Sequence, residues 1–242
     1  MVSQVKEFSN RRQSAAQFGS QTFSSAATGN TELGCAAIPP VTEFSKRAID
    51  IALSLALLAL LSPVFLALAG AVRMSGRQIL FRQWRVGRHG RLFQCLKYRT
   101  MTPDAEQKLE QLLRDHPELA AEWERSQKLK NDPRITRVGK FLRRTSLDEL
   151  PQLWNVLRGD MSLVGPRPIM PEQLPLYGRA AKWYLAMRPG ITGLWQVTAR
   201  GDGNFSRRIA LDCHYVRTHR LWNDWWILLK TPLVVLTGRG AV

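Results

Sequence analysis

Hydrophobic positions are concentrated in one stretch of the chain, where the 22 residues 51–72 carry no charged side chain. As an α-helix this stretch is ~33 Å long at ~1.5 Å per residue, which is enough to cross the hydrocarbon core of a bilayer. Ser62 and Pro63 lie near its middle. A proline inside a helix removes a backbone donor and clashes with the preceding turn. The pattern therefore predicts a membrane helix that is kinked or broken at Ser62-Pro63.

The charged residues on either side of this stretch bear on its topology. Lys46 and Arg47 precede it, and Arg73 and Arg77 follow it. Because cations are retained on the cytosolic side, their presence at both ends favours a helix that dips into one leaflet and returns. The alternative is an ordinary spanning helix with a tolerated proline and its amino end outside. The charges therefore favour a re-entrant membrane helix over residues 44–75, and on the residues alone the spanning alternative stays open.

Other periodic patterns predict smaller elements. Polar and apolar residues alternate over residues 79–99 around the sequence Gly-Arg-His-Gly at 87–90, which predicts a β-hairpin with a glycine-bounded turn. Apolar residues at helical spacing over 103–130 predict a helical region that is broken near Pro117. Three tryptophans beside an aliphatic run over 222–230 indicate either a helix at the bilayer interface or a buried core helix.

The amino-terminal residues have a different composition. Residues 1–43 are rich in Ser, Thr, Gln, Gly and Ala, which predicts a disordered polar tail, and they contain no apolar core of a secretory signal. The fold class that we expect is mostly α with a small β-hairpin. It combines the re-entrant membrane helix with a compact cytosolic α/β domain, over residues 76–242, that carries interfacial amphipathic helices.

Composition narrows the classes of function. The formal net charge of +16 over 242 residues draws the protein toward polyanions, which include nucleic acid, anionic lipid head groups and phosphorylated substrates. Three cysteines without CxxC or Cys/His spacing argue for a reducing compartment and against a structural zinc site or a disulfide framework.

Two adjacent carboxylates, Asp148 and Glu149, follow five cations within residues 134–144. One explanation is local, because Ser146 and Glu149 have the spacing of a capping box. The other is chemical. Pro151 places the acids at or just before a helix start, where backbone N–H groups can also bind phosphate. Nearby cations or a divalent metal ion can screen the repulsion between the acids and a phosphate. A carboxylate in that position can attack phosphorus as a nucleophile.

Further candidates lie in two glycine- and proline-rich loops. Arg167 lies between prolines at the end of residues 158–168, and a rigid guanidinium suits bidentate recognition of phosphate. Arg200 lies in the second loop, which residues 189–197 and 199–201 form, and Asp212 follows on a predicted helix. Taken singly, each of these features favours a structural role.

Five ordered motifs follow the broken apolar stretch. They are Lys-Tyr-Arg-Thr-Met at 97–101, Thr-Ser-Leu-Asp-Glu-Leu-Pro-Gln at 145–152, Val-Gly-Pro-Arg-Pro at 164–168, Pro-Gly-Ile-Thr-Gly-Leu-Trp-Gln-Val at 189–197 and Asp-Cys-His-Tyr-Val at 212–216. Together they resemble the bacterial sugar transferases, the monotopic polyprenyl-phosphate sugar-1-phosphate transferases, from about residue 44 to the carboxyl terminus. Larger members carry several spanning helices ahead of this region, so the chain resembles the small catalytic form with an added tail. Residues 76–242 then form a catalytic domain at the cytosolic face.

The resemblance implies transfer of a sugar-1-phosphate from a UDP-hexose to undecaprenyl phosphate, with release of UMP and a covalent aspartyl-phosphosugar intermediate. It implies a location among the lipids of the cell inner membrane, at the cytoplasmic face, and the first membrane step of exopolysaccharide or glycan synthesis. The choice among glucose, galactose and N-acetylated sugars stays open. So does the oligomeric state, although the apolar carboxyl-terminal helix suits a homodimer.

The resemblance also implies roles for individual residues. Asp148 resembles the nucleophile on the β-phosphorus, and Glu149 resembles its partner in an acid dyad that holds Mg²⁺. Asp212 resembles a further polar residue of the site. The resemblance favours Arg144 over Arg143, which stays as an alternative. The cations expected around the phosphates are Lys97, Arg99, Arg143, Arg144, Arg167 and Arg200.

Two other classes of function compete with this interpretation. A nucleic-acid-binding protein would explain the charge but leaves the uncharged apolar stretch without a purpose, so nucleic acid is not expected as a partner. A non-catalytic, membrane-anchored basic scaffold would use the acid pair as a helix cap and the arginines as lipid contacts. It predicts that no UMP is released from any UDP-sugar.

Overall fold

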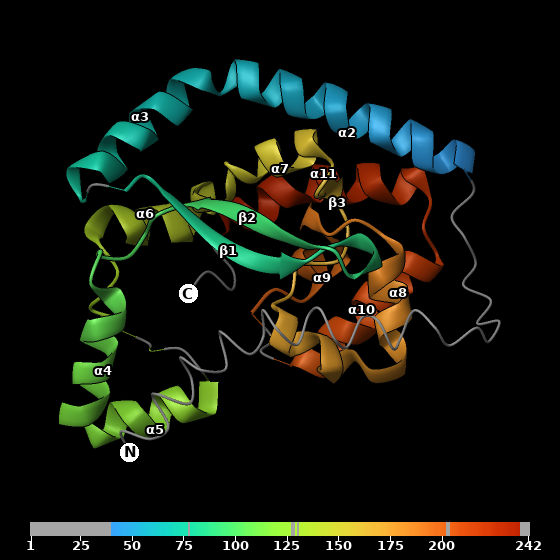
Figure 1. Ribbon diagram of the computed structural model, residues 1–242. Helices are drawn as coiled ribbons and strands as arrows, with labels where there is room; N and C mark the ends of the chain where they lie inside the picture. Colours follow the sequence, from blue (N-terminus) through green and yellow to red (C-terminus); the bar gives the residue numbers. More distant parts are fainter. Residues whose placement is uncertain (1–39, 77, 127–128, 130, 202–203, 238–242) are drawn as a thin grey trace.

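The computed structural model describes residues 40–237, apart from 77, 127–128, 130 and 202–203 (Figure 1). The polar tail expected over residues 1–43 lies outside the described residues as far as residue 39. Helix α2 begins at Pro40 rather than at residue 44, so the last residues assigned to the tail are helical.

The uncharged stretch forms two helices, α2 (Pro40–Leu60) and α3 (Ser62–Met74), which are bent by 65° relative to one another. Pro63 lies in the first turn of α3, where a proline costs no helical hydrogen bond, and the Ser62 hydroxyl donates to the Ala59 carbonyl at 2.8 Å. The predicted break is therefore confirmed. Among the described helices none alone is long and apolar enough to cross a membrane; α2 and α3 together are, by length and composition only. Re-entry itself stays a prediction.

The predicted hairpin is present. Strand β1 (Leu80–Val86) pairs antiparallel with β2 (Leu92–Tyr98), with Val86 opposite Leu92 at the turn. The connection is the short 3₁₀ turn η1 (Arg88–Gly90), in which His89 adopts φ 56° and Gly90 φ 77°. The glycine takes this left-handed backbone without steric cost, which explains its value in the turn.

Helices follow the hairpin. α4 (Ala105–Asp115) and α5 (Pro117–Ser126) form the two arms of the predicted helical region, and Pro117 starts the second arm, as expected. They project away from the rest of the protein at the lower left of Figure 1. α6 (Arg137–Thr145), the 3₁₀ turn η2 (Leu147–Glu149) and α7 (Gln152–Arg158) then return the chain to the hairpin.

The last part of the chain contains a second, parallel strand pair that the sequence did not reveal. Its elements are β3 (Ser162–Val164), the 3₁₀ segment η3 (Pro171–Ala180), α8 (Ala181–Ala186), β4 (Gly190–Thr192), α9 (Leu194–Thr198), α10 (Phe205–Arg217) and α11 (Leu221–Leu236). Strands β3 and β4 pair in parallel. A Cβ added to Gly190 would lie 2.1 Å from the Gly165 nitrogen, so the backbones meet with no space for a side chain.

The main core lies between the hairpin and the carboxyl-terminal helices. Phe93 and Cys95 of β2 pack with residues of α7, β3, α10 and α11, and α2 covers this core through partly buried leucines. In Figure 1 α2 and α3 form a bent arm above α7 and α11. The fold is mostly helical with a small antiparallel sheet, as expected.

Helix α11 combines both interpretations of the tryptophan-rich segment. Asp224 and Ile227 are buried, whereas Trp222, Leu229 and Leu236 are 78%, 74% and 82% exposed. One face therefore packs on the core and the opposite face is apolar and exposed. Its location at a bilayer interface stays a prediction.

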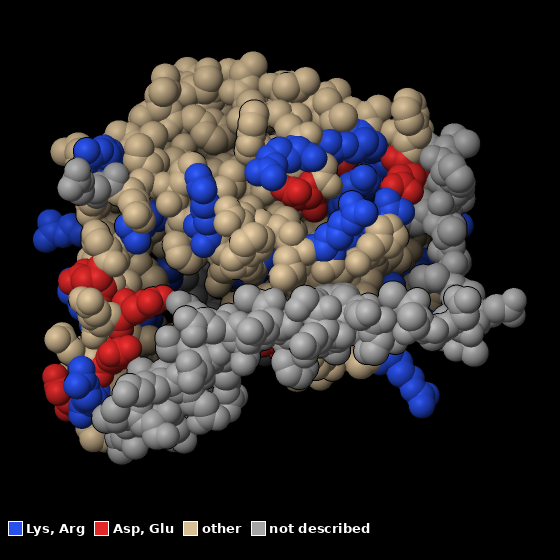
Figure 2. All heavy atoms as spheres, in the orientation of Figure 1, with Lys and Arg blue, Asp and Glu red and all other residues tan. Residues whose placement is uncertain are grey.

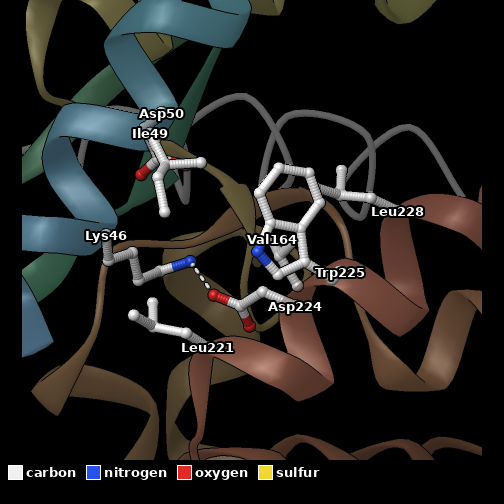
Figure 3. A pocket seen from close by; sticks show the side chains of 8 residues that line it. All are labelled: Lys46, Ile49, Asp50, Val164, Leu221, Asp224, Trp225 and Leu228. Atoms are coloured by element: carbon white, nitrogen blue, oxygen red, sulfur yellow. Dashed lines mark hydrogen bonds and ion pairs between the residues drawn. The ribbon is translucent and has the colours of Figure 1, made fainter.

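Polar contacts tie the start of α2 to the core. The Lys46 ammonium lies 2.7 Å from the Asp224 carboxylate of α11 (Figure 3). The Asp50 carboxylate accepts from the Leu163 N–H of β3 at 3.0 Å. Arg47 donates to the Val156 and Leu157 carbonyls at the end of α7. These contacts fix the amino-terminal end of the arm.

Candidate functional site

The acid pair lies on η2, the single 3₁₀ turn between α6 and α7. Helix α6 ends because Ser146 adopts a left-handed backbone, φ 55°, and Pro151 stands immediately ahead of α7. Successive residues of a 3₁₀ turn point about 120° apart, so the side chains of Asp148 and Glu149 diverge. The two carboxylates therefore meet different surroundings.

Glu149 is held by two cations. Its Oε1 atom accepts from Lys97 Nζ at 2.7 Å and from Arg167 Nη2 at 3.0 Å. Burial would raise the pKa of this carboxyl, but Arg167 and Lys97 outweigh it and hold the pKa far below its ordinary value. In return the Glu149 carboxylate raises the pKa of the Arg167 guanidinium. Glu149 is thus ionised and fixed, and it aligns the two cations.

Asp148 is in the opposite condition. It is 9% exposed and accepts no hydrogen bond from the described residues; the nearest cation, Lys97 Nζ, is 3.8 Å from Oδ2. Burial raises the pKa of Asp148 and the charge of Glu149 adds to the rise, while Lys97 and Arg143 oppose it. A carboxylate that is partly desolvated and that accepts no hydrogen bond from a neighbouring donor is available to react or to bind a metal ion.

The capping-box explanation of the acid pair is wrong. Ser146 makes no cap hydrogen bond, and its hydroxyl instead accepts from Arg200 Nη2 at 2.8 Å. The side chain of Glu149 binds Lys97 and Arg167 rather than the backbone of Ser146. The acids are therefore not explained by helix capping.

The structure separates the predicted cations into two groups. Lys97, Arg167 and Arg200 lie around the acid pair, and Arg143 joins them: its Nε donates to the Thr100 hydroxyl at 2.9 Å and its charge lowers the pKa of Asp148.

Two other predicted cations do not reach the acid pair. Arg144 is exposed and Arg99 half-buried, and neither side chain makes a hydrogen bond or ion pair with any described residue. The structure places Arg143 rather than Arg144 near the acid pair, because residue 143 is on the side of α6 that faces the hairpin. Which of the two arginines binds phosphate stays a prediction. Figure 2 shows Lys and Arg gathered with acidic side chains beneath an uncharged upper region, where Figure 1 places α2 and α3.

Asp212 lies behind Arg167 rather than beside the acid pair. It is 2% exposed, accepts from the Tyr177 hydroxyl at 2.9 Å and lies 3.7 Å from Arg208 Nε. Arg208 in turn donates to the Arg167 carbonyl at 2.8 Å. Burial raises the pKa of Asp212 to about 6, although Arg208 and Tyr177 oppose the rise. Asp212 therefore supports the loop that presents Arg167.

Comparison with known proteins decides the family. The family model described as "Bacterial sugar transferase" matches residues 41–238. The chain belongs to the bacterial sugar transferase family. An undecaprenyl-phosphate galactose phosphotransferase of Salmonella typhimurium is 50% identical over 200 residues, which are 83% of this chain and 42% of that protein.

Other members of the bacterial sugar transferase family are similar over most of this chain. The exopolysaccharide production protein ExoY of Sinorhizobium fredii is 44% identical over 206 residues, 85% of this chain and 91% of that protein. A UDP-glucose:undecaprenyl-phosphate glucose-1-phosphate transferase of Caulobacter vibrioides is 41% identical over 208 residues, 82% of this chain and 72% of that protein. The chain spans less than half the length of some curated relatives it matches.

Sequence reasoning missed three residues that support the candidate site. Arg208 and Asp212 are four residues apart on α10, a spacing that favours an ion pair and could have drawn attention to Arg208. Tyr177 gave no such signal. Asn155 is fully buried, accepts from the Leu96 N–H and donates to the Gln94 carbonyl. It thereby joins α7 to β2, the strand that carries Lys97, and only the folded structure reveals this.

The acid pair fits a magnesium ion in one particular way. The described residues contain no group of three or more His, Cys, Asp or Glu side chains that could hold a metal ion. Mg²⁺, however, is commonly bound by one or two carboxylates together with substrate phosphates and water. Within the described part of the chain, neither oxygen of Asp148 accepts a hydrogen bond, and only Oε1 of Glu149 does. Magnesium binding jointly with substrate stays a prediction.

Proposed function

We propose that the chain is a polyprenyl-phosphate sugar-1-phosphate transferase that moves a sugar-1-phosphate from a UDP-hexose to undecaprenyl phosphate at the cytoplasmic face of the inner membrane. The names of the relatives support the class of donor and acceptor. The observation that carries the proposal is the carboxylate of Asp148, which is buried among cations but receives no hydrogen bond from the described residues.

In the first step an Asp148 oxygen attacks the β-phosphorus of the donor. The bond from this phosphorus to the bridging oxygen breaks, the bridging oxygen keeps the electron pair, and UMP leaves. In the second step an oxygen of the lipid phosphate attacks the same phosphorus and releases the Asp148 carboxylate. A divalent ion, when bound, would neutralise charge on the diphosphate. The covalent step allows the soluble product to leave before the lipid substrate reacts.

Cations make the approach of a carboxylate to a diphosphate possible. Lys97 and Arg167 are already aligned by Glu149, and Arg143 and Arg200 are held by Thr100 and Ser146. Preorganised charges of this kind stabilise a transition state without having to reorganise during the reaction. In this mechanism Glu149 acts mainly by positioning cations.

Contacts at both ends of the bent arm support re-entry. The α2 end is tied to the catalytic domain by the Lys46–Asp224 ion pair. At the other end Val72 of α3 packs against Tyr98 and Leu142, which belong to the same domain. A segment whose two ends contact one folded domain returns to the side from which it enters the bilayer.

The test is Asp148→Asn, with the exposed Asp115→Asn as a control. We expect the first variant to be folded and membrane-bound but inactive, because an amide is not a nucleophile at phosphorus. Incubated with a panel of UDP-sugars and no lipid acceptor, wild type and the control should release about one UMP per chain, and Asp148→Asn none. Near-normal turnover by Asp148→Asn, with undecaprenyl phosphate supplied, would refute the assignment.

A further inference from the structure

A second group of charged residues lines a small cavity at the turn end of the hairpin. We call it the turn-end cluster and define it by Glu43, Lys46, Arg47, Asp50, Arg88 and Arg188. Arg88 is in η1, whereas Lys97, which contacts the acid pair, is near the far end of β2. The cluster is therefore separate from the candidate active site, and no step of the proposed reaction uses it.

The arginines of the turn-end cluster already bind one oxyanion, the carboxylate of Glu43. Arg88 donates hydrogen bonds to both oxygens of the Glu43 carboxylate, with Nη2 3.1 Å from Oε2. Arg188 Nη1 donates to Oε1 at 3.4 Å. Arg88 Nε is buried and has no hydrogen-bond partner among the described residues. Guanidinium forks suit phosphate oxygens as well as carboxylates.

Positive charge remains after these pairs are formed. Four cations and two carboxylates line the cavity, and Asp224 neutralises Lys46. Among the described residues, one positive charge is then left without a carboxylate. A phosphodiester carries one negative charge and would balance it, whereas the dianion of a phosphate monoester would exceed it.

The cluster also lies where the uncharged stretch begins. Phe44, which follows Glu43 on α2, is 76% exposed. The Lys46–Asp224 pair brings the first turn of α11 close to α2, and Trp225 lines the same small pocket as Lys46 (Figure 3). Cations and exposed aromatic rings at the end of a membrane segment are typical of the head-group layer.

We propose that the turn-end cluster binds the phosphodiester of an anionic glycerophospholipid, with Arg88 and Arg188 as the main ligands. The proposal rests on the membrane placement of α2 that the proposed function includes. Glu43 competes for the same donors. The hydrogen bond from Arg188 to Glu43 is longer than that from Arg88, and the lipid phosphate replaces Glu43 as the acceptor for Arg188.

Binding is tested on detergent-purified full-length protein titrated with short-chain phosphatidylglycerol. Native mass spectrometry counts bound lipid, and thermal unfolding reports saturation. Wild type should bind one lipid per chain with a saturable rise in Tm. Arg88→Gln/Arg188→Gln should weaken binding at least tenfold, and the exposed Arg91→Gln, from the same turn, should bind as wild type does.

A second variant protects the test against a folding defect. Glu43→Gln removes the competing carboxylate and should tighten binding of phosphatidylglycerol. Unchanged binding in both Glu43→Gln and the double variant would overturn the proposal. An equal saturable response to inorganic phosphate would also overturn it, because the cavity would then be a site for the free anion. Asp148→Asn should bind lipid normally, so failure of the proposed reaction and failure of this site are distinguishable.

Discussion

Replacement of Asp212 by asparagine tests whether ionisation of the buried carboxyl behind Arg167 destabilises the folded protein. The pKa of Asp212 is raised by burial from an ordinary 3.8 to about 6. Between these pH values the folded protein keeps a proton that the unfolded chain has lost. The free energy of unfolding therefore falls as pH rises through this window.

The magnitude follows from the gap of about two pKa units. At about 1.36 kcal/mol per unit, the wild-type protein loses about 3 kcal/mol of stability through this group between about pH 4 and pH 6. Above that range the carboxylate is ionised and pairs with Arg208, which donates to the main chain of Arg167. An asparagine has no proton to lose, so the variant lacks this pH dependence, and its turnover should fall because Arg208 loses its carboxylate partner.

The assay is urea unfolding of wild type and Asp212→Asn in the same detergent micelles, at steps from about pH 4 to pH 8. Other titrating groups largely cancel in the difference between the two proteins. The stability of the variant relative to wild type should rise by about 3 kcal/mol and level off above pH 6. A difference that does not vary with pH would mean that Asp212 ionises at its ordinary pKa in the folded protein, and the argument would fail.

Three further predictions concern the frame and charges of the site. Gly139→Ala should cost more than about 2 kcal/mol in thermal unfolding, because the new Cβ would lie 2.0 Å from the Thr100 carbonyl oxygen; an unchanged Tm would contradict the packing. Lys97→Gln should move the acidic limb of the pH–rate profile to higher pH, because Lys97 is the leading charge that lowers the pKa of Asp148; a shift to lower pH would contradict this assignment. Asp224→Asn should destabilise the protein by about 3–5 kcal/mol in urea unfolding, since an ammonium group stays buried without its partner, and a loss below about 1 kcal/mol would count against a buried pair.

Local patterns predicted those parts of the fold that local chemistry decides. Pro63 and Pro117 each lie in the first turn of a helix at the expected position, and the glycine-bounded turn closes the hairpin. Each feature depends on the backbone limits of one or two residues. Such limits act whatever the rest of the chain does.

Contacts between distant segments could not be predicted in the same way. Strands β3 and β4 have three residues each, too few for an alternation of polar and apolar positions. The capping-box spacing of Ser146 and Glu149 was misleading, because two cations from other elements compete for the glutamate more strongly than the backbone does.

The candidate site shows the same division. The motifs identified Asp148, Glu149, Lys97 and Arg167 as neighbours, and the structure brings them together. Position along the chain could not decide between residues 143 and 144, since only the orientation of α6 against the hairpin makes one of them face inward.

The contact of Gly165 with Gly190 and Gly193 limits how this protein can be redesigned. A methyl group at any of the three positions would collide with main-chain atoms of another of them or of a neighbouring residue. The loop that begins at Gly165 and carries Arg167 is consequently fixed by peptide units rather than by exchangeable side chains. A protein engineer who wants to change the sugar donor would have to keep the Arg167 guanidinium in place and replace the side chains around it.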